Sequence, residues 1–316
     1  MKSILFLGYS NVLKARVFPF IHSLGVSSIS IAKFAGQEWD DKYKDIKIPV
    51  TRYDSYEEGL KHYDGNLVYI SIVNSEHFKY ARKSLEAGFN TIVDKPAAMT
   101  LKESEELVAL AKLKNLLLSE STVYLFHPQM EFVKKLFMQN SEVPKLMTVY
   151  FTMPPFSEDN FRYRTELGGG AIMDTAPYAS SICRYFFEDQ PIKIVSVINE
   201  AREDGLVIEY SLIMKFPDKR CMIGHFGFNT EYINRVMLIG NRLNVSFDRA
   251  FTIPDTMVNK IHVVRMNEHR DLDAPAGNKF MIYLKEVLDK LENKDFNSYY
   301  QALLYDAKVR ELINNK

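Results

Sequence analysis

The stretch Thr91-Ile92-Val93-Asp94-Lys95-Pro96-Ala97-Ala98 decides the fold that we expect for this chain. Residues 91–93 are β-branched and predict a buried strand of a parallel sheet. Pro96 fixes its own φ and disfavours a helical Lys95, so the strand must end there. Ligands bind at the carboxyl ends of strands in open α/β sheets, where Lys95 could polarise a substrate oxygen or pass a proton. A surface lysine in a turn is an equally good interpretation of this tripeptide alone.

The composition is that of an ordinary two-domain globular protein. Of the 316 residues, 47% are hydrophobic and 25% charged, which is enough apolar material for cores and argues against disorder. Lys+Arg and Asp+Glu are both 40, so we expect neither a nucleic acid nor a membrane as partner. The two cysteines, Cys183 and Cys221, predict neither a disulfide framework nor a metal cluster. We find no pattern of a signal peptide or a membrane span and expect a cytoplasmic protein.

The N-terminal segment has the pattern of a dinucleotide-binding unit. Residues 4–7 predict a buried strand closed by Gly8, and Asn11 is expected to cap a helix that runs to about residue 23. The start of such a helix holds a pyrophosphate. The glycine fingerprint is incomplete, because its later places fall on Ser10 and Leu13, so a plain strand–turn–helix is the alternative. The candidate pyrophosphate-binding residues are Gly8, Ser10, Asn11 and Val12.

The end of the second expected strand, residues 28–32, bears on the choice of cofactor. An acid at this place would bind the adenosine ribose hydroxyls of NAD. This chain has Lys33 there, after the small residue Ala32, which leaves room and charge for the 2′-phosphate of NADP. A solvated lysine that begins a loop is the alternative. We therefore expect NADP or NAD, with NADP favoured.

The next segments continue the alternation of strands and helices. Residues 67–72 predict a strand that leads to Asn74, which should face the same sheet edge as Lys95. Ser75 is expected to cap the following helix, in whose first turn His77 is either a ligand contact or a capping or packing residue. Thr100 and Glu103 have capping-box spacing before another helix, and residues 116–118 predict another strand. The alternation predicts a doubly wound parallel sheet.

In the second half, successive strands replace the alternation. One helix, residues 173–186, interrupts them, and residues 279–291 and 301–313 predict C-terminal helices. This order predicts an α+β domain with a large, mostly antiparallel open sheet. We expect a dinucleotide-binding domain in residues 1–122 and a substrate-binding and oligomerisation domain in residues 123–316. The expected strands are residues 146–152, 192–198, 206–215, 221–228, 236–239 and 244–247.

The helix after the triple glycine at residues 168–170 carries candidate catalytic groups. The glycines would let the backbone approach a substrate closely. Asp174 and Tyr178 are four residues apart and should share one helix face. A tyrosine has an ordinary pKa near 10 and can donate a proton at neutral pH, although a half-buried packing residue is the alternative. Arg162 and Arg164 could hold an anionic substrate group or be solvated.

The ordered set of motifs resembles the glucose–fructose oxidoreductase and inositol dehydrogenase family, often called Gfo/Idh/MocA. The resemblance covers nearly the whole chain, and the order of the motifs carries it rather than any one of them. The matching stretches are Tyr69-Ile70-Ser71 with Asn74, Ser75 and His77, then Asp94-Lys95-Pro96, then Phe126-His127-Pro128-Gln129, then Gly168-Gly169-Gly170-Ala171-Ile172-Met173-Asp174 with Tyr178.

This resemblance implies roles for particular residues. The family's lysine of Glu-Lys-Pro lies beside the nicotinamide and falls on Lys95, and its later acid and its histidine or tyrosine fall on Asp174 and Tyr178. The tyrosine and residues 240–254 are similar to the branch with sugar-nucleotide ketoreductases. Further candidate cofactor-binding residues are Lys33, Asn74, His77, Asp94, Lys95 and Pro96. Candidate substrate-binding residues are Lys95, His127, Arg162, Arg164, Asp174 and Tyr178.

We therefore expect a Rossmann-type oxidoreductase that moves hydride between a nicotinamide and a sugar or sugar-nucleotide carbon. Lys95 would polarise the carbonyl oxygen, Tyr178 would supply the proton, and Asp174 would orient the pair. The same groups serve alcohol oxidation in reverse. The alternatives are a non-redox epimerase or lyase with retained cofactor, and a regulatory protein that binds cofactor or sugar without catalysis. The family's habit also implies a homo-oligomer, a dimer or tetramer joined through the second-domain sheet.

Overall fold

The computed structural model describes residues 3–40, 44 and 46–314, and its internal contacts divide the chain into two compact units. Unit 1 comprises Met1–Ser121 and Phe280–Leu304, and unit 2 comprises Thr122–Lys279 and Tyr305–Lys316. The expected second domain, residues 123–316, therefore differs from unit 2, because the segment from Phe280 belongs to unit 1. The buried hydrogen bond of 2.7 Å between the hydroxyls of Tyr283 and Ser119 is one reason.

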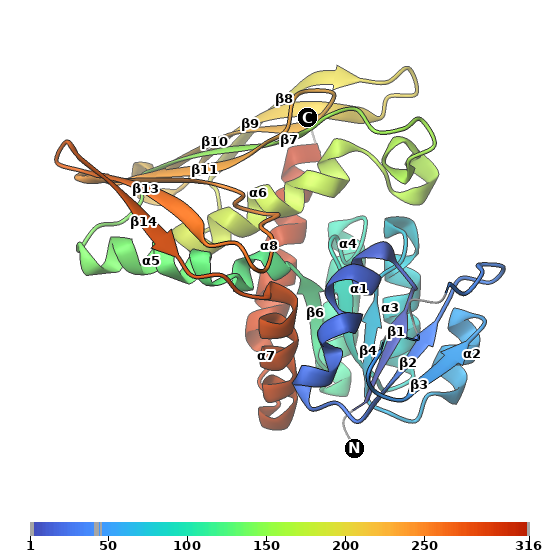
Figure 1. Ribbon diagram of the computed structural model, residues 1–316. Coiled ribbons are helices and arrows are strands. Elements are labelled where there is room, and N and C mark those ends of the chain that lie inside the picture. Colours follow the sequence, from blue (N-terminus) through green and yellow to red (C-terminus); the bar gives the residue numbers. More distant parts are fainter. Residues whose placement is uncertain (1–2, 41–43, 45, 315–316) are drawn as a thin grey trace. The chain divides into compact units, whose positions relative to one another are not determined.

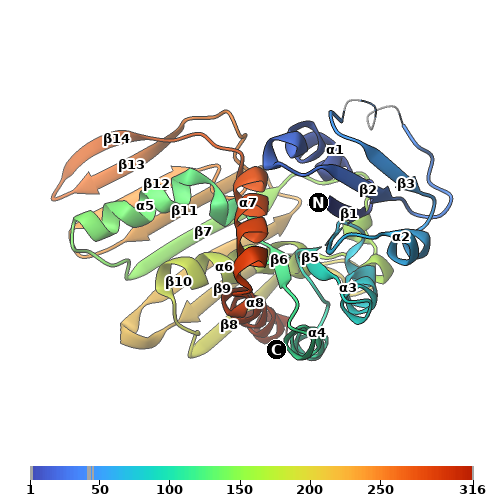
Figure 2. The same ribbon diagram turned by 90° about the horizontal axis from the view of Figure 1, so that it is seen from below.

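Unit 1 is built on a parallel sheet, as the sequence predicted (Figure 1). Among the described residues, six strands lie in the order β3-β2-β1-β4-β5-β6, so the order reverses between β1 and β4. Helices α2, α3 and α4 cover one face and α1 and α7 the other (Figure 2). Such a reversal places a ligand crevice at the carboxyl ends of β1 and β4. The strands are β1 Ser3–Leu7, β2 Ser28–Ala32, β3 Val50–Tyr53, β4 Leu67–Ile70, β5 Asn90–Asp94 and β6 Leu118–Ser121, and the helices are α1 Asn11–Arg16, α2 Tyr56–His62, α3 His77–Glu86, α4 Leu101–Lys114 and α7 Lys279–Asn293.

Helix α1 is shorter than predicted and begins differently. Its N-cap is Ser10 rather than Asn11, and the Ser10 side chain accepts a hydrogen bond from the backbone N–H of Leu13. The α-helix ends at Arg16 and a 3₁₀ segment, Phe18–Leu24, follows. Pro19 explains the change, because a proline inside an α-helix removes a backbone donor and clashes with the preceding turn.

The sequence predicted the N-terminal cap of α4 correctly but not that of α3. A 3₁₀ turn, Asn74–Glu76, precedes α3, and no side chain caps that helix, so the prediction for Ser75 was wrong. The capping box before α4 is confirmed. The Thr100 hydroxyl accepts from the Glu103 N–H at 3.1 Å, and the Glu103 carboxylate accepts from the Thr100 N–H at 3.1 Å.

Unit 2 is built on a second, mostly antiparallel sheet, which confirms the predicted fold class. Among the described residues, eight strands lie in the order β14-β13-β12-β11-β7-β10-β9-β8, and β7 and β10 are the parallel pair. Helices α5 and α6 cover the same face of the sheet (Figure 2). The strands are β7 Leu146–Met153, β8 Lys193–Ala201, β9 Val207–Lys215, β10 Cys221–Phe228, β11 Ile233–Ile239, β12 Leu243–Asp248, β13 Asn259–Arg265 and β14 Glu268–Ala274, and the helices are α5 Pro128–Gln139, α6 Ala171–Phe187 and α8 Asn297–Asn314, whose first half lies in unit 1.

The other face of this sheet is open and partly apolar. Val195 of β8 pairs with Ile213 of β9, which in turn pairs with Ile223 of β10, and each of these side chains is 42–44% exposed. The alternate residues of the same strands, such as Leu212 and Met222, are buried under α6. The alternation therefore distinguishes a core face from an apolar outer face. Among the described residues, no helix combines the length and the apolar character that crossing a membrane requires.

Candidate functional site

The loop that carries Lys95 follows β5 and is braced on both sides by its neighbours in the sheet. The carboxylate of Asp94, the last residue of β5, accepts hydrogen bonds of 2.8 Å from the hydroxyls of Tyr69 and Ser121. Tyr69 belongs to β4 and Ser121 to β6. Asp94 therefore ties the carboxyl ends of three neighbouring strands together directly before Lys95.

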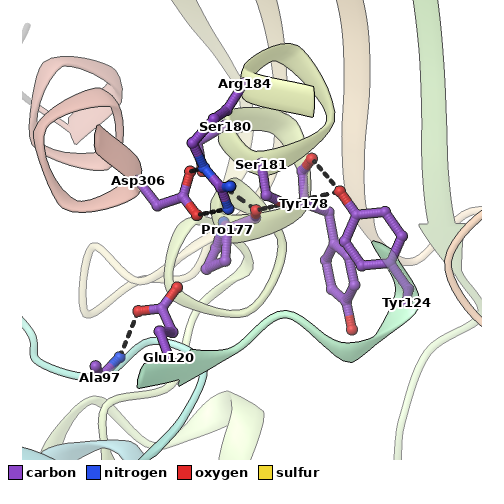
Figure 3. A network of polar contacts seen from close by, with 9 residues as sticks. All are labelled: Ala97, Glu120, Tyr124, Pro177, Tyr178, Ser180, Ser181, Arg184 and Asp306. Carbon is purple, nitrogen blue, oxygen red and sulfur yellow. Dashed lines mark hydrogen bonds and ion pairs between the residues drawn. The ribbon is translucent and has the colours of Figure 1, made fainter. Parts of the chain in front are cut away.

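Two further side chains hold the residues after Lys95. The backbone N–H of Ala97 donates to the Glu120 carboxylate at 2.7 Å (Figure 3). The Nδ1 atom of His77 lies 2.7 Å from the carbonyl oxygen of Pro96, and its Nε2 atom lies 3.1 Å from that of Ile72. The Lys95–Pro96 peptide bond is cis. The loop therefore presents the half-buried Lys95 side chain from a backbone that is fixed on both sides.

His77 was predicted as a candidate cofactor contact, but its side chain is completely buried. Burial lowers the pKa of His77, while hydrogen bonds to the two carbonyl oxygens and the nearby Asp94 oppose this effect. Both ring nitrogens face backbone acceptors. We therefore propose that His77 acts by clamping the loop after β4 to the loop that contains Lys95, rather than by touching the cofactor.

The turn after β1 fits a dinucleotide despite its incomplete glycine fingerprint. Gly8 has a φ of 112°, and a Cβ atom there would lie 2.0 Å from the carbonyl oxygen of Ser71, so only glycine can occupy this position. The Ser10 hydroxyl lies 2.9 Å from that of Ser71. Asn11 and Val12 are exposed residues, and as the first residues of α1 their backbone N–H groups have no intrahelical acceptor. Such donors suit a pyrophosphate.

Lys33 is neither solvated nor free. Only 7% of the residue is exposed, and its Nζ atom lies 3.1 Å from the carboxylate of Asp54, directly after β3. The sequence missed Asp54 because β3 is a short edge strand in which Thr51 and Arg52 are exposed. Asn74, the first residue of the 3₁₀ turn that follows β4, is 9% exposed.

In unit 2, three aromatic rings enclose the ring of Tyr178. Its centroid lies 4.9 Å from Phe151, 5.1 Å from Phe251 and 5.5 Å from Tyr124. Phe151 meets it edge-on, and the side chain of Tyr178 remains half-buried. Stacked and edge-to-face aromatic contacts restrict both χ angles of a tyrosine. The phenol is therefore held in one direction. The packing interpretation of Tyr178 is confirmed, and its role as a proton donor stays a prediction.

The backbone of Tyr178 is held by a hydrogen-bond network around Pro177 (Figure 3). Pro177 interrupts the hydrogen bonds of α6, and its carbonyl oxygen accepts from the hydroxyls of Ser180 and Ser181. Because the Ser181 hydroxyl donates to Pro177, the Tyr124 hydroxyl donates to Ser181 at 2.7 Å, and the Tyr178 carbonyl oxygen lies 3.5 Å from it. Tyr124 therefore contacts both the ring and the backbone of Tyr178.

Asp174 forms an ion pair that the sequence did not predict. The Nε atom of Arg162 lies 2.8 Å from the Asp174 carboxylate, which is almost completely buried. The guanidinium group also lies 4.9 Å from the ring centroid of Phe156 and 4.7 Å from that of Phe161. Arg162 thus neutralises Asp174, and a solvated Arg162 is excluded. Arg164 is exposed, with one terminal nitrogen 4.0 Å from the Glu166 carboxylate.

The triple glycine has a structural reason within unit 2. A Cβ atom on Gly169 would lie 2.7–2.8 Å from the backbone oxygens of Phe161, Arg162 and Arg164. The sequence predicted that the glycines let the backbone approach a substrate closely. At Gly169 the closely approaching group is instead the backbone of residues 161–164. Gly169 lets residues 161–164 pack against the start of α6 and brings Arg162 to Asp174.

His127 is the N-cap of α5 and is almost completely buried. Its Nδ1 atom accepts from the Gln129 N–H at 3.2 Å, so the neutral ring carries its proton on Nε2. Burial, helped by the positive charge of Lys279, lowers the pKa of His127 to about 4. This burial makes His127 a structural cap in unit 2, and its predicted contact with substrate remains untested.

The pKa of His127 predicts a loss of stability in mild acid. Because the folded-state pKa of about 4 lies below the ordinary value, the unfolded chain binds the proton first as the pH falls. Between pH 7 and pH 5, this linkage should lower the free energy of unfolding by about 2 kcal/mol. His127→Asn keeps a good capping acceptor and should remove that part of the pH dependence. Urea unfolding of both proteins at both pH values measures it, and parallel pH profiles would contradict the assignment.

Two family models and several known proteins match this chain. The family model described as "Oxidoreductase family, NAD-binding Rossmann fold" matches residues 6–122, and the "GFO/IDH/MocA C-terminal domain" matches residues 144–248. A dTDP-3,4-didehydro-2,6-dideoxy-alpha-D-glucose 3-reductase of Saccharopolyspora spinosa is 31% identical over 226 residues, which cover 71% of this chain and 68% of that protein. The enzyme of the same name from Actinomadura kijaniata is 23% identical and covers 96% of this chain and 88% of its own.

Solved structures show the same fold at lower identity. KijD10, a 3-ketoreductase from Actinomadura kijaniata in complex with NADP and TDP-benzene, has a TM-score of 0.89 at 21% identity and covers 99% of this chain and 96% of its own. An aldose-aldose oxidoreductase from Caulobacter crescentus has a TM-score of 0.84 at 18% identity, with coverage of 99% and 96%. The chain therefore belongs to the Gfo/Idh/MocA family of oxidoreductases, and its N-terminal part is the NAD-binding Rossmann domain of that family.

Proposed function

We propose that this oxidoreductase is an NADP(H)-dependent ketoreductase that acts on a nucleoside diphosphate sugar. The observation that carries the proposal is the enclosed ring of Tyr178, a rigid proton donor on the helix that follows the triple glycine. Lys95 is the matching cationic group on the Rossmann sheet. The relatives named as dTDP-sugar 3-reductases support the substrate class, and the NADP and TDP-benzene bound to KijD10 support both ligands.

Lys95 and Tyr178 would act on one carbonyl oxygen of the substrate. The bound nicotinamide supplies a hydride to the carbonyl carbon. Lys95 donates a hydrogen bond to the oxygen and stabilises its developing negative charge, and the Tyr178 hydroxyl delivers the proton. Asp174, neutralised by Arg162, is better suited to orient its neighbours than to transfer a proton itself. The exposed Arg164 is a candidate for the substrate's diphosphate.

A substrate panel tests this function. We expect NADPH oxidation with a 3-keto sugar linked to a nucleoside diphosphate, and little oxidation with the same sugar free. Family membership favours an enzyme over a binding protein without catalysis. If turnover of a sugar nucleotide occurs without net change in nicotinamide absorbance, on tightly retained cofactor, the epimerase or lyase alternative holds instead.

The cofactor preference should depend on Lys33. We expect NADPH to bind more tightly than NADH, and Lys33→Glu to narrow or reverse the preference by about tenfold, the size of one charge-assisted phosphate contact. The dissociation constants of both nucleotides for both proteins measure this. Equal affinity of the unaltered protein for NADPH and NADH would contradict it.

We also propose that the protein is a homo-oligomer joined through the open face of the unit 2 sheet. The exposed apolar row of Val195, Ile213 and Ile223 supports this, because contiguous apolar patches mark association surfaces. Ile213→Lys should place an unpaired charge in the interface and raise the dissociation constant at least about 100-fold. Light scattering at micromolar concentration measures the assembly. Leu113→Lys, at an 84% exposed site of α4, is the control, and a monomeric unaltered protein would refute the proposal.

A further inference from the structure

Four side chains at the carboxyl ends of β2 and β3 form a compact group, which we call the Trp39 cluster: Lys33, Trp39, Arg52 and Asp54. The Lys33 Nζ atom lies 5.8 Å and the Arg52 Cζ atom 5.5 Å from the ring centroid of Trp39. The carboxylate of Asp54 accepts a hydrogen bond from the Trp39 Nε1–H at 3.1 Å and lies 3.1 Å from the Lys33 Nζ atom. Two cations and an indole donor thus surround one anion.

The members of the Trp39 cluster differ strongly in exposure. The side chain of Lys33 is 9% exposed and that of Asp54 is 78% exposed, so the anion is the outermost member. The hydrogen bond from Trp39, followed by that from Lys33, lowers the pKa of Asp54. Asp54 is therefore a solvent-exposed carboxylate that accepts hydrogen bonds from Trp39 and Lys33. Because its side chain is exposed, it can rotate away without unpacking the core.

The position of the Trp39 cluster suggests which other anion could replace the Asp54 carboxylate on these donors. The end of β2 is where dinucleotide-binding sheets contact the adenosine ribose. A phosphate monoester has more negative charge than a carboxylate and is favoured by paired cationic donors. A ribose that carries only hydroxyls would instead need an acceptor such as Asp54 itself. The Trp39 cluster could therefore bind a 2′-phosphate through its cationic donors, or bind a 2′-hydroxyl through the Asp54 carboxylate.

We propose that the Trp39 cluster binds the 2′-phosphate of NADP(H), and that Asp54 is a built-in competing anion that occupies the donors of Lys33 and Trp39 when the phosphate is absent. This proposal rests on the proposed use of NADP(H). It assigns to Asp54 the role of setting the nucleotide affinity: the carboxylate opposes the phosphate both by holding its donors and by like-charge repulsion.

The sequence supplies a direct probe, because Trp39 is the single tryptophan of the chain. Its intrinsic fluorescence can be titrated with adenosine 2′,5′-bisphosphate and with 5′-AMP, which lacks the 2′-phosphate. We expect the bisphosphate to bind at least about tenfold more tightly than 5′-AMP to the unaltered protein. Asp54→Asn should tighten the bisphosphate by about fivefold and leave 5′-AMP within about twofold.

Asp64→Asn is the matched control, because Asp64 is an exposed acid of unit 1 that precedes the amino end of the central strand β4, whereas the Trp39 cluster lies at the carboxyl ends of β2 and β3. It should leave both affinities unchanged within about twofold. If Asp54→Asn weakens 5′-AMP and NADH, Asp54 accepts from ribose hydroxyls and the proposal is overturned. It is also overturned if the bisphosphate binds no more tightly than 5′-AMP. These titrations need no turnover, so a failed substrate panel beside a successful titration would reject the proposed reaction and leave the phosphate site standing.

Discussion

Replacing Lys95 by methionine should lower kcat by at least about 10³-fold while the dissociation constant of NADPH stays within a few-fold of its original value. Methionine keeps much of the aliphatic length of lysine but removes the charge and the donor. The loop should keep its conformation, because Asp94, His77 and Glu120 hold its backbone through contacts that do not involve the lysine side chain. The pyrophosphate is expected elsewhere, near Gly8.

Steady-state turnover on the true substrate and a nucleotide titration together measure this effect. Lys102→Met, at an exposed position of α4, is the control for the loss of one positive charge. It should leave both quantities unchanged. Near-normal turnover of Lys95→Met would remove Lys95 from the reaction, and a joint loss of turnover and NADPH binding would make it a cofactor ligand only.

Tyr178→Phe should lower kcat by about 10²–10⁴-fold, the usual contribution of a general acid. The change removes only a hydroxyl, and the rings of Tyr124, Phe151 and Phe251 should hold phenylalanine in the same place. Stability should therefore change little, which separates lost chemistry from lost structure. Asp174→Asn should have a smaller effect on kcat.

Tyr185→Phe is the matched control for the tyrosine, because Tyr185 lies on the same helix and its hydroxyl donates to Glu131 at 3.4 Å near the surface. Its turnover should be unchanged. Thermal unfolding and kcat measured on both variants decide the matter. A Tyr178→Phe enzyme that keeps its turnover would show that Tyr178 is a packing residue alone.

The sequence analysis missed β3 and β14, which lack a contiguous or alternating apolar pattern. It also missed β13, Asn259–Arg265, although Asn259, Ile261 and Val263 are buried in alternation with more exposed residues. Strand β14, Glu268–Ala274, has exposed or half-exposed residues almost throughout, so no alternation marked it. Helix α5 was missed because its cap is His127 rather than a common capping residue, although Met130, Val133 and Phe137 follow helical spacing on its buried face.

The candidate site was predictable where a residue stands at the end of a strand or on a helix face, as Lys95 and Tyr178 do. The groups that hold Lys95 and Tyr178 in place could not be predicted, because these groups come together only in the folded protein. Phe151 of β7 and Phe251, beyond β12, reach Tyr178 from segments that are distant in sequence. A pairing between residues so far apart leaves no local pattern. Asp54 was missed for a different reason, because the short edge strand before it, β3, has no apolar pattern.

The structure of the protein in complex with NADP⁺ and a nucleoside diphosphate sugar tests the central claim most directly. The account predicts that the Lys95 Nζ atom and the Tyr178 hydroxyl both lie within about 3.2 Å of one sugar oxygen, with the nicotinamide about 3–3.5 Å from the carbon that bears it. A complex in which that oxygen touches only one of the two side chains, with the domains closed on the substrate, would contradict it.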